Sequence, residues 1–226
     1  MGLTKEVKIF VVLMMVAIAM MGVAIYLLVS PKSTVIRSPV VLMLKREMLV
    51  PSWSVFQGDP KAPFTLVEFG DYECPPCRDM EPKVAGILNA KAGKLNRVFH
   101  HCVRVTDHPN AKTLALAVQA AGEQGKLWQM HETIFNNQNA FDGATPARVT
   151  EELTKLARET GLDVDSFNKA RESKSARDAV DRMEALAKAM KVSVTPTFCI
   201  VRPKGPMLFL SIRDMEYWLN DPEFWK

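Results

Sequence analysis

The segment VEFGDYECPPC, residues 67–77, decides the fold because it joins a strand to a helix and has two cysteines at the junction. Residues 64–69 are rich in β-branched and aromatic side chains, which favours a strand. Residues 70–73 read Gly-Asp-Tyr-Glu and predict a turn. A helix is then expected to begin near Cys74, because apolar residues recur beyond it at helical spacing. These apolar residues are Met80, Val84, Ile87 and Leu88.

The two cysteines of this segment are suited to disulfide exchange. The nucleophile in that reaction is a thiolate. Cys74 is expected at the helix N-terminus, where unpaired N–H groups and the positive end of the helix dipole stabilise a negative charge. Cys77 lies one turn further on and can attack a mixed disulfide formed at Cys74. Pro75 and Pro76 fit the first helical turn, where a missing donor costs little. The pattern therefore indicates a redox pair, with a pKa for Cys74 below the ~8.5 of a free thiol.

Two other uses of the pair are open from the sequence. A lone CxxC can be half of a zinc site, and His100 with Cys102, on one face of the next predicted strand, could complete a set of four ligands. The pair could also be a structural disulfide. No second CxxC occurs in the chain, and redox catalysis is favoured over both alternatives.

Composition narrows the functional class. The chain has 226 residues, 48% of them hydrophobic, which suits one domain with an appendage. The formal charge of +4 is spread without a basic block, which argues against a nucleic-acid partner. Four cysteines do not make a disulfide-stapled scaffold. Cys102 and Cys199 are predicted on strands separated by a third, about 9.6 Å apart. That is too far for a disulfide, so both are interpreted as buried small hydrophobes.

The remainder of the chain predicts an α/β fold. A second strand is expected over Arg97–Val105 and a long helical stretch over about Asn110–Met190. Two further strands, Thr197–Val201 and Met207–Ile212, should form a hairpin, and a short helix should close the chain at Met215–Leu219. Because a helix joins the first two strands, they should be parallel. Breaks in the helical stretch are expected at Gly125, at Asp142-Gly143 and at Gly161, with Asp163 as a helix N-cap.

An uncharged apolar run near the N-terminus, Ile9–Val29, is long enough for a transmembrane helix, since it would rise about 31 Å. We expect residues 1–30 to be a retained membrane anchor. The alternatives are a signal peptide cleaved after Ala19 or Ala24 and a buried core helix. The flanking lysines and arginines do not settle the orientation. The redox chemistry favours a domain on the outer side of the membrane.

Residues 31–57 are interpreted as a tether, because prolines and serines interrupt them. Residues 41–48 could form a short helix within it. An ordered N-terminal extension of the fold is the alternative. The domain itself is expected over residues 58–226.

Five segments, taken in order, resemble the DsbA-like thioredoxin-fold proteins, and most closely the membrane-anchored bacterial members. The resemblance extends over about residues 58–212, and the set is specific although no single segment is. The segments are GDPKAP (58–63), VEFGDYECPPC (67–77), HPNA (108–111), QGKLWQMH (124–131) and VTPTF (194–198).

The resemblance implies a thioredoxin fold with an inserted helical domain at about residues 107–191. It implies Cys74 as the nucleophile and Cys77 as the resolving thiol. The Thr195-Pro196 bond would be the cis-proline loop opposite the disulfide, where substrate backbone docks. The candidate substrate-contacting residues are Thr195, Pro196, Pro75 and Pro76.

The acid at Glu68 matches a buried acid that family members use for proton transfer near the resolving cysteine. The alternative is an edge residue in solvent. His108 and His131 are interpreted as packing or helix-surface residues, and the Glu73 side chain is expected in solvent.

The sequence departs from the family pattern in ways that concern the direction of electron flow. Val194 stands where the family often has glycine. The Pro-Pro between the cysteines is not the Pro-His of strong oxidants. The direction therefore stays open, and the pKa of Cys74 is expected above the ~3.5 of DsbA.

The expected function is thiol–disulfide exchange outside the membrane of a bacterial cell, with oxidation of protein dithiols as the leading direction. The resemblance implies two kinds of partner: cysteine-containing protein substrates and a membrane quinone-linked oxidase. No cofactor beyond the Cys74–Cys77 disulfide and no metal is expected. The alternatives are a reductase fed by a membrane electron carrier and a peptide-binding holdase.

Overall fold

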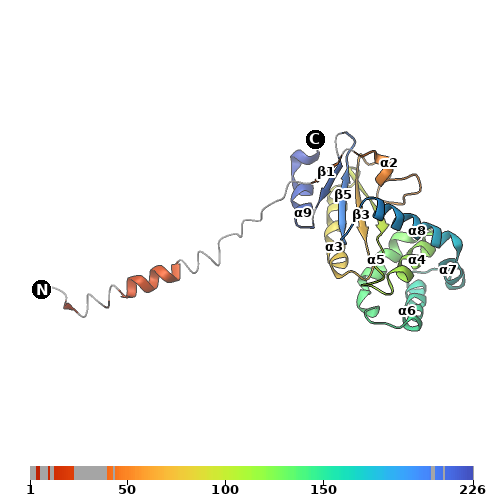
Figure 1. Cartoon of the computed structure of the whole chain (residues 1–226), viewed down its shortest axis with the longest axis horizontal. Helices are drawn as coiled ribbons and strands as arrows, with labels where there is room; N and C mark the ends of the chain where they lie inside the picture. The colour runs from red at the N-terminus through yellow and green to blue at the C-terminus, as the bar shows by residue number, and fades with distance from the viewer. Residues whose placement is uncertain are drawn as a thin grey trace. The chain divides into compact units, whose positions relative to one another are not determined.

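The computed structural model describes residues 4–5, 10, 13–22, 40–42, 44–204, 207–210 and 212–225. The chain divides into two compact units, residues 1–37 and 38–226. The sheet and the helices packed on it belong to the second unit (Figure 1).

In the first unit, residues 13–22 are helical and their side chains are exposed. Apart from these residues and Phe10, the predicted anchor Ile9–Val29 lies outside the described residues. Among the described ranges, no helix combines the length and the apolar character that crossing a membrane requires. Membrane anchoring therefore stays a prediction from the sequence.

Within the described residues, the second unit is built on a mixed sheet of six strands in the order β1-β6-β5-β3-β4-β2. Strand β3 (Phe64–Gly70) is parallel to β4 (Leu95–His101) and antiparallel to β5 (Thr197–Val201). Strands β5 and β6 (Met207–Leu210) are antiparallel neighbours, as the predicted hairpin requires. The edge strands are β1 (Val40–Leu42) and β2 (Phe56–Gln57). The predicted mixed sheet is confirmed.

Strand β3 leads directly into the cysteine segment, and all seven of its residues are buried. One face of the sheet packs against α3 (Pro75–Ala90) and α9 (Ile212–Asn220). The other face packs against α8 (Lys174–Ala189) and the N-terminal extension. Because β3 is covered on both faces, the point at which it ends is fixed in the molecule. Of the apolar residues predicted to recur along this helix, Met80, Val84 and Ile87 are buried.

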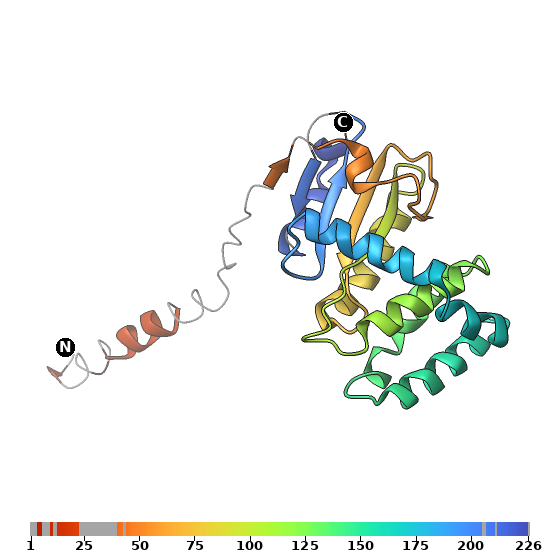
Figure 2. The ribbon, with the colours of Figure 1, turned by 45° about the vertical axis from the view of Figure 1, so that its right-hand side comes forward.

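The insertion between β4 and β5 lies wholly within the described residues and is helical. Its α-helices are α4 (Ala111–Gly122), α5 (Leu127–Asn136), α6 (Pro146–Glu159), α7 (Val164–Arg171) and α8. Figure 2 shows the green to teal helices gathered at one end of the sheet, with α8 running back across it. The breaks fall at the predicted glycines, and the Asp163 carboxylate accepts a hydrogen bond from the Ser166 N–H, as an N-cap does. The core of these helices also contains Tyr72, Cys74 and Cys77.

Two sequence predictions need correction. Strand β4 ends at His101 and not at Val105, because the Cys102 N–H makes a last bond to the Gly70 carbonyl and the chain then turns. The short helix predicted over residues 41–48 is also wrong in extent. Residues 40–42 are a strand that covers the open edge of β6, and α2 (Arg46–Leu49) is a single turn.

The segment interpreted as a tether or as an extension of the fold is ordered where it is described. Residues 44–57 include α2 and β2, and Leu49 and Val50 are buried against the sheet. Of the two alternatives, the ordered extension describes these residues.

Candidate active site

A tight turn carries the chain from β3 into the cysteines. The Asp71 carboxylate is buried and accepts hydrogen bonds from the N–H groups of Glu73 and Arg104, at 2.8 and 3.0 Å. The Nδ1 of His108 lies 3.0 Å from the same carboxylate. A side chain at Gly70 would meet the Phe99 ring within 2.5 Å, so only glycine fits there. These contacts fix the direction in which the turn delivers Cys74.

Cys74 is the N-cap of α3, and Pro75 and Pro76 occupy the first helical positions. The N–H groups of Cys77 and Arg78 bond to the Cys74 carbonyl at 3.1 and 3.3 Å. Cys74 is 5% exposed and Cys77 is 0% exposed, while both prolines are exposed. The predicted helix start is confirmed, and the two sulfurs have unequal access to solvent.

The Thr195-Pro196 peptide bond is cis. The loop that contains it lies against the cysteine pair, since the Cys74 thiol donates to the Thr195 carbonyl at 3.3 Å. Pro196 is buried, Thr195 is half-buried, and the neighbouring Val194 is 63% exposed. Residues 121 positions apart in sequence are thus brought together at one site.

The surroundings of Cys74 stabilise its thiolate. The pKa of Cys74 falls to about 6, first because the Cys77 thiol donates a hydrogen bond to its sulfur. A hydrogen bond from the Thr195 side chain, the Cys77 N–H and the charge of His108 act in the same direction, while burial opposes them. This pKa lies inside the range predicted from the sequence.

The surroundings of Cys77 have the opposite effect. Burial raises the pKa of Cys77 well above its ordinary value, and the hydrogen bond with Cys74 and the charge of Glu68 raise it further. At neutral pH the pair is therefore one thiolate and one thiol. The sequence argument from the helix N-terminus predicted this order of the two pKa values.

The prediction that the Glu73 side chain lies in solvent holds only in part, because this side chain is half-buried. Its carboxylate accepts hydrogen bonds from the Asn110 backbone N–H at 2.6 Å and from the Asn110 side chain at 3.0 Å. Asn110 directly precedes α4. Glu73 therefore connects the cysteine turn to the helical insertion.

Glu68 is 0% exposed, so the alternative of an edge residue in solvent is wrong. Its Oε2 accepts a hydrogen bond from Arg97 at 2.6 Å. Its Oε1 is buried and finds no hydrogen-bond partner among the described residues. Burial raises the pKa of Glu68 to about 8, although the Arg97 charge opposes the shift. A carboxyl group with this pKa can give or take a proton near neutral pH.

A second carboxylate, which sequence reasoning missed, shares Arg97 with Glu68. Both terminal nitrogens of Arg97 bond to Glu81, at 3.0 and 2.5 Å. Glu81 is four residues after Cys77 and lies on the same face of α3. Burial opposes ionisation of Glu81, but the charge of Arg97 and the hydrogen bonds from Arg97 and His131 hold its pKa well below its usual range. Nothing in the sequence around Arg97 or Glu81 indicated this pairing, because it joins a strand to a helix through tertiary contacts.

The helical insertion contacts the cysteine turn through two further side chains. The Gln138 amide donates to the carbonyls of Tyr72 and Cys74, at 2.8 and 3.0 Å. The His131 ring lies 2.8 Å from the Tyr72 hydroxyl and 3.1 Å from Glu81. His131 is fully buried, so of the two interpretations made from sequence, packing applies and helix surface does not.

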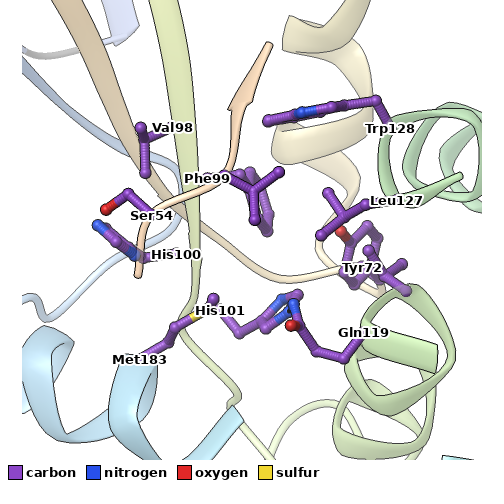
Figure 3. Close-up of a pocket in the computed structure, with 12 residues that line it drawn as sticks. Ser54, Tyr72, Val98, Phe99, His100, His101, Gln119, Leu127, Trp128 and Met183 are labelled. Carbon is purple, nitrogen blue, oxygen red and sulfur yellow. Dashed lines mark hydrogen bonds between the residues drawn. The ribbon is translucent and has the colours of Figure 1, made fainter. Parts of the chain in front are cut away.

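Two hollows flank this site. A cleft of about 400 Å³ opens beside the cysteine turn, lined by residues that include Pro75, Arg78 and His108. A small cavity of about 10 Å³ lies behind Tyr72. Figure 3 shows the side chains of His101 and Gln119 directed toward one another there, and their nitrogens are 2.8 Å apart.

The other cysteines lie away from α3. Cys199 is buried in β5, as predicted, and Cys102 is half-buried just after β4. All four cysteines are thiols in this structure. The Nε2 of His100 bonds to the Leu49 carbonyl at 2.8 Å, so this ring is held toward the N-terminal extension.

Comparisons with known proteins agree with this geometry. A family model described as thioredoxin matches residues 52–203. Among solved structures, a thioredoxin-like oxidoreductase from Silicibacter pomeroyi DSS-3 is 24% identical, with a TM-score of 0.61 over 78% of this chain and 95% of that one. BdbD from Bacillus subtilis in its oxidised form is 21% identical, with a TM-score of 0.62 over 80% and 94%. A variant of alpha-DsbA1 from Wolbachia pipientis is 19% identical, with a TM-score of 0.65 over 79% and 94%.

Curated relatives share the domain and not the whole chain. The Na(+)/H(+) antiporter NhaA 1 of Mycolicibacterium gilvum is 31% identical over 173 residues, which are 74% of this chain and 27% of that protein. The Na(+)/H(+) antiporter NhaA 3 of Salinispora tropica is 33% identical over 64% of this chain and 21% of that protein. The chain thus spans about a fifth to a quarter of the length of these relatives.

Proposed function

This chain belongs to the thioredoxin family and has the fold of DsbA-like thiol–disulfide oxidoreductases, and on that premise we propose that it is an extracytoplasmic dithiol oxidase. Its substrates are proteins with pairs of reduced cysteines. The observation that carries the proposal is the contrast within the pair. Cys74 has a lowered pKa at a helix N-terminus, and Cys77 has a raised pKa in the core.

The reaction begins with the Cys74–Cys77 disulfide. A substrate thiolate attacks the Cys74 sulfur, a mixed disulfide forms, and the electron pair of the broken bond goes to the Cys77 sulfur. Cys77 then takes a proton from Glu68. A second substrate thiolate attacks the substrate sulfur of the mixed disulfide and releases Cys74 as a thiolate. The substrate gains a disulfide, and its two electrons remain on the reduced pair.

The properties of Cys74 as a leaving group support oxidation as the direction of electron flow. A thiolate with a lowered pKa leaves faster, and its stability favours the reduced pair over the disulfide. The disulfide is therefore oxidising, which favours an oxidase over the alternative of a reductase. A non-catalytic holdase would need neither unequal cysteines nor a buried acid with a raised pKa.

Substrate backbone docks against the cis-proline loop of Thr195 and Pro196, which faces Cys74. Pro75 and Pro76, which directly follow Cys74 and are exposed, offer apolar surface for contact with the substrate. The reaction as proposed uses no cofactor and no metal beyond the cysteine pair.

The site of action is the outer side of a bacterial membrane, with Ile9–Val29 as the anchor. The support for this is the length of the uncharged apolar run in the sequence. A membrane redox partner, a quinone-linked oxidase, would restore the disulfide by accepting two electrons. An electron-donating partner would belong to the reductase alternative.

The reduction potential of the Cys74–Cys77 pair against glutathione tests the proposal. An oxidase with a moderately lowered Cys74 pKa should fall between about −270 mV, typical of thioredoxin, and about −120 mV, typical of DsbA. A potential at or below that of thioredoxin would support the reductase and contradict the oxidase.

A further inference from the structure

Arg97 is shared between two buried carboxylates whose hydrogen bonding is unequal. Glu81 receives both terminal nitrogens of Arg97, and Glu68 receives one. Within the part of the chain that the structure describes, the second oxygen of Glu68 has no hydrogen-bond partner. One cation facing two carboxyl groups in a buried site favours one proton on the pair, because two buried negative charges on one positive charge are costly.

The His131 ring contacts Glu81 and so makes the surroundings of the two carboxyl groups different. Burial lowers the pKa of His131, so its ring is neutral at pH 7 and has one N–H. The Nε2 is 3.1 Å from Glu81, and the Nδ1 is 2.8 Å from the Tyr72 hydroxyl. Burial raises the pKa of Tyr72 well above its ordinary value, so this hydroxyl keeps its proton and can donate. The arrangement that satisfies every atom has Nε2–H donating to Glu81 and Tyr72 donating to Nδ1.

We infer that His131 is a positioning residue for the thiol chemistry: by donating to Glu81 it keeps that carboxylate ionised and leaves the shared proton on Glu68, next to Cys77. The inference deepens the proposed function and rests on it. Without the His131 donor, the proton would divide between the two carboxyl groups, and Glu68 would hold it less often.

The charged and titratable groups around this network come from several elements. They are Arg97 from β4, Cys77 and Glu81 from α3, Cys74 and Tyr72 from the turn, and His131 from α5. His101 also faces His131, and burial lowers its pKa to about 3. No group in this set other than His131 donates to Glu81 from the helical insertion, within the hydrogen bonds of the described residues.

The consequence for Cys77 concerns its proton. When Cys77 leaves the disulfide, it needs a proton from Glu68, and when it attacks a mixed disulfide, it must give that proton back. Glu68 acts directly on the pKa of Cys77. A proton held by Glu81 instead would be on a side chain one turn of α3 beyond Cys77. His131 thus connects the helical insertion to the protonation of the resolving cysteine.

The test compares His131→Phe with His131→Gln in the full-length protein. Phenylalanine keeps the ring volume and removes both nitrogens, whereas the glutamine amide can replace the Nε2–H donor. The glutathione mixed disulfide at Cys74 is formed, and the rate at which Cys77 displaces glutathione is followed against pH. Because loss of one charge-assisted hydrogen bond is involved, the pH at which this rate rises should fall by about one unit in His131→Phe. His131→Gln should restore the wild-type profile.

The matched control is His101→Phe, which removes another buried imidazole, one that contacts the uncharged side chain of Gln119. His101→Phe should leave the pH dependence of the rate of glutathione displacement unchanged. A second measurement is ¹³C NMR of glutamate-labelled protein, with Glu81→Gln to assign the signals. It should show the Glu68 carboxyl titrating at lower pH in His131→Phe.

An unchanged profile and unchanged carboxyl titrations in folded His131→Phe would overturn the inference, and so would an equal shift in His101→Phe. Failure of the proposed oxidase function gives a different result. In that case the wild-type pair would show a thioredoxin-like potential, whatever the effect of His131 on Glu68.

Discussion

The two cysteines of the pair are three residues apart, yet their surroundings move their pKa values in opposite directions. Cys74 caps a helix, touches the cis-proline loop and is next to two exposed prolines. Cys77 lies one turn later, in the core, near Glu68. The sequence motif places two cysteines close together, and their surroundings in the fold make Cys74 the nucleophile and Cys77 the resolving thiol. The pKa of the outer cysteine is lowered by hydrogen bonds from Cys77 and from the cis-proline loop. The pKa of the inner cysteine is raised by burial, by its hydrogen bond with Cys74 and by the charge of Glu68 on β3.

The largest expected effect separates the roles of the two sulfurs. Cys77→Ser should accumulate a mixed disulfide with a protein substrate through Cys74, because the resolving thiol is gone. Cys74→Ser should trap none, since Cys77 is fully buried and its pKa is raised. Turnover should be lost in both. Non-reducing gels and mass spectrometry of the adduct provide the measurement, and an adduct formed through Cys77 would reverse the assignment.

The next effect concerns the charges behind Cys77. Arg97→Met should destabilise the protein by about 3–5 kcal/mol at pH 7, because two buried carboxyl groups lose their cation. The pKa values of both groups should then be raised, so the variant should regain stability as the pH falls toward ~4.3, the value for an unfolded glutamate. Urea denaturation at several pH values measures this. Arg97→Lys, which keeps the charge, should lose less, and a loss that does not depend on pH would show a packing effect only.

A smaller effect is expected from Glu68→Gln, which keeps the shape and removes the proton carrier. The rate at which Cys77 resolves a mixed disulfide should fall by on the order of 100-fold, the usual contribution of a general acid or base. The rise of this rate near pH 8, where Glu68 titrates, should flatten. Glu132→Gln is the control, because that carboxylate is exposed and bonds to Gln57. Equal slowing in both variants would exclude a special role for Glu68.

The smallest effect tests whether the remaining cysteines belong to the site. Cys102→Ala combined with Cys199→Ala should keep peptide-oxidation activity within a few fold, because both lie on or after strands and away from the α3 N-terminus. The cost should be in stability, about 1 kcal/mol for the cavity left at Cys199. Complete loss of activity with an intact circular dichroism spectrum would show that one of them takes part in exchange.

The features predictable from sequence were those with local causes. The strand before the motif, the helix start at Cys74 and the breaks at the insertion glycines follow from periodicity, helix-end chemistry and turn propensity, and all were confirmed. The edge strands β1 and β2 were missed because three and two residues are too few to show a pattern.

The network behind Cys77 could not be predicted in the same way. Glu68 was identified by resemblance, but its partner Arg97 is 29 residues away, and Glu81 pairs with a histidine 50 residues further on. Each of these side chains, taken alone, has the sequence context of an ordinary surface or packing residue. Only the tertiary fold shows that one arginine serves two carboxyl groups.

The central claim is that the reduced pair consists of one stable thiolate and one thiol. Ultraviolet titration of thiolate absorbance in wild type, Cys77→Ser and Cys74→Ser tests it most directly. Wild type should show one thiolate step with a midpoint at about pH 6. Cys77→Ser should keep a step below the ~8.5 of a free thiol, because the serine hydroxyl can still donate a hydrogen bond to the Cys74 sulfur. In Cys74→Ser the low-pH step should be absent. A step near pH 6 that persists without Cys74, or a wild type with no thiolate below ~8.5, would contradict the account.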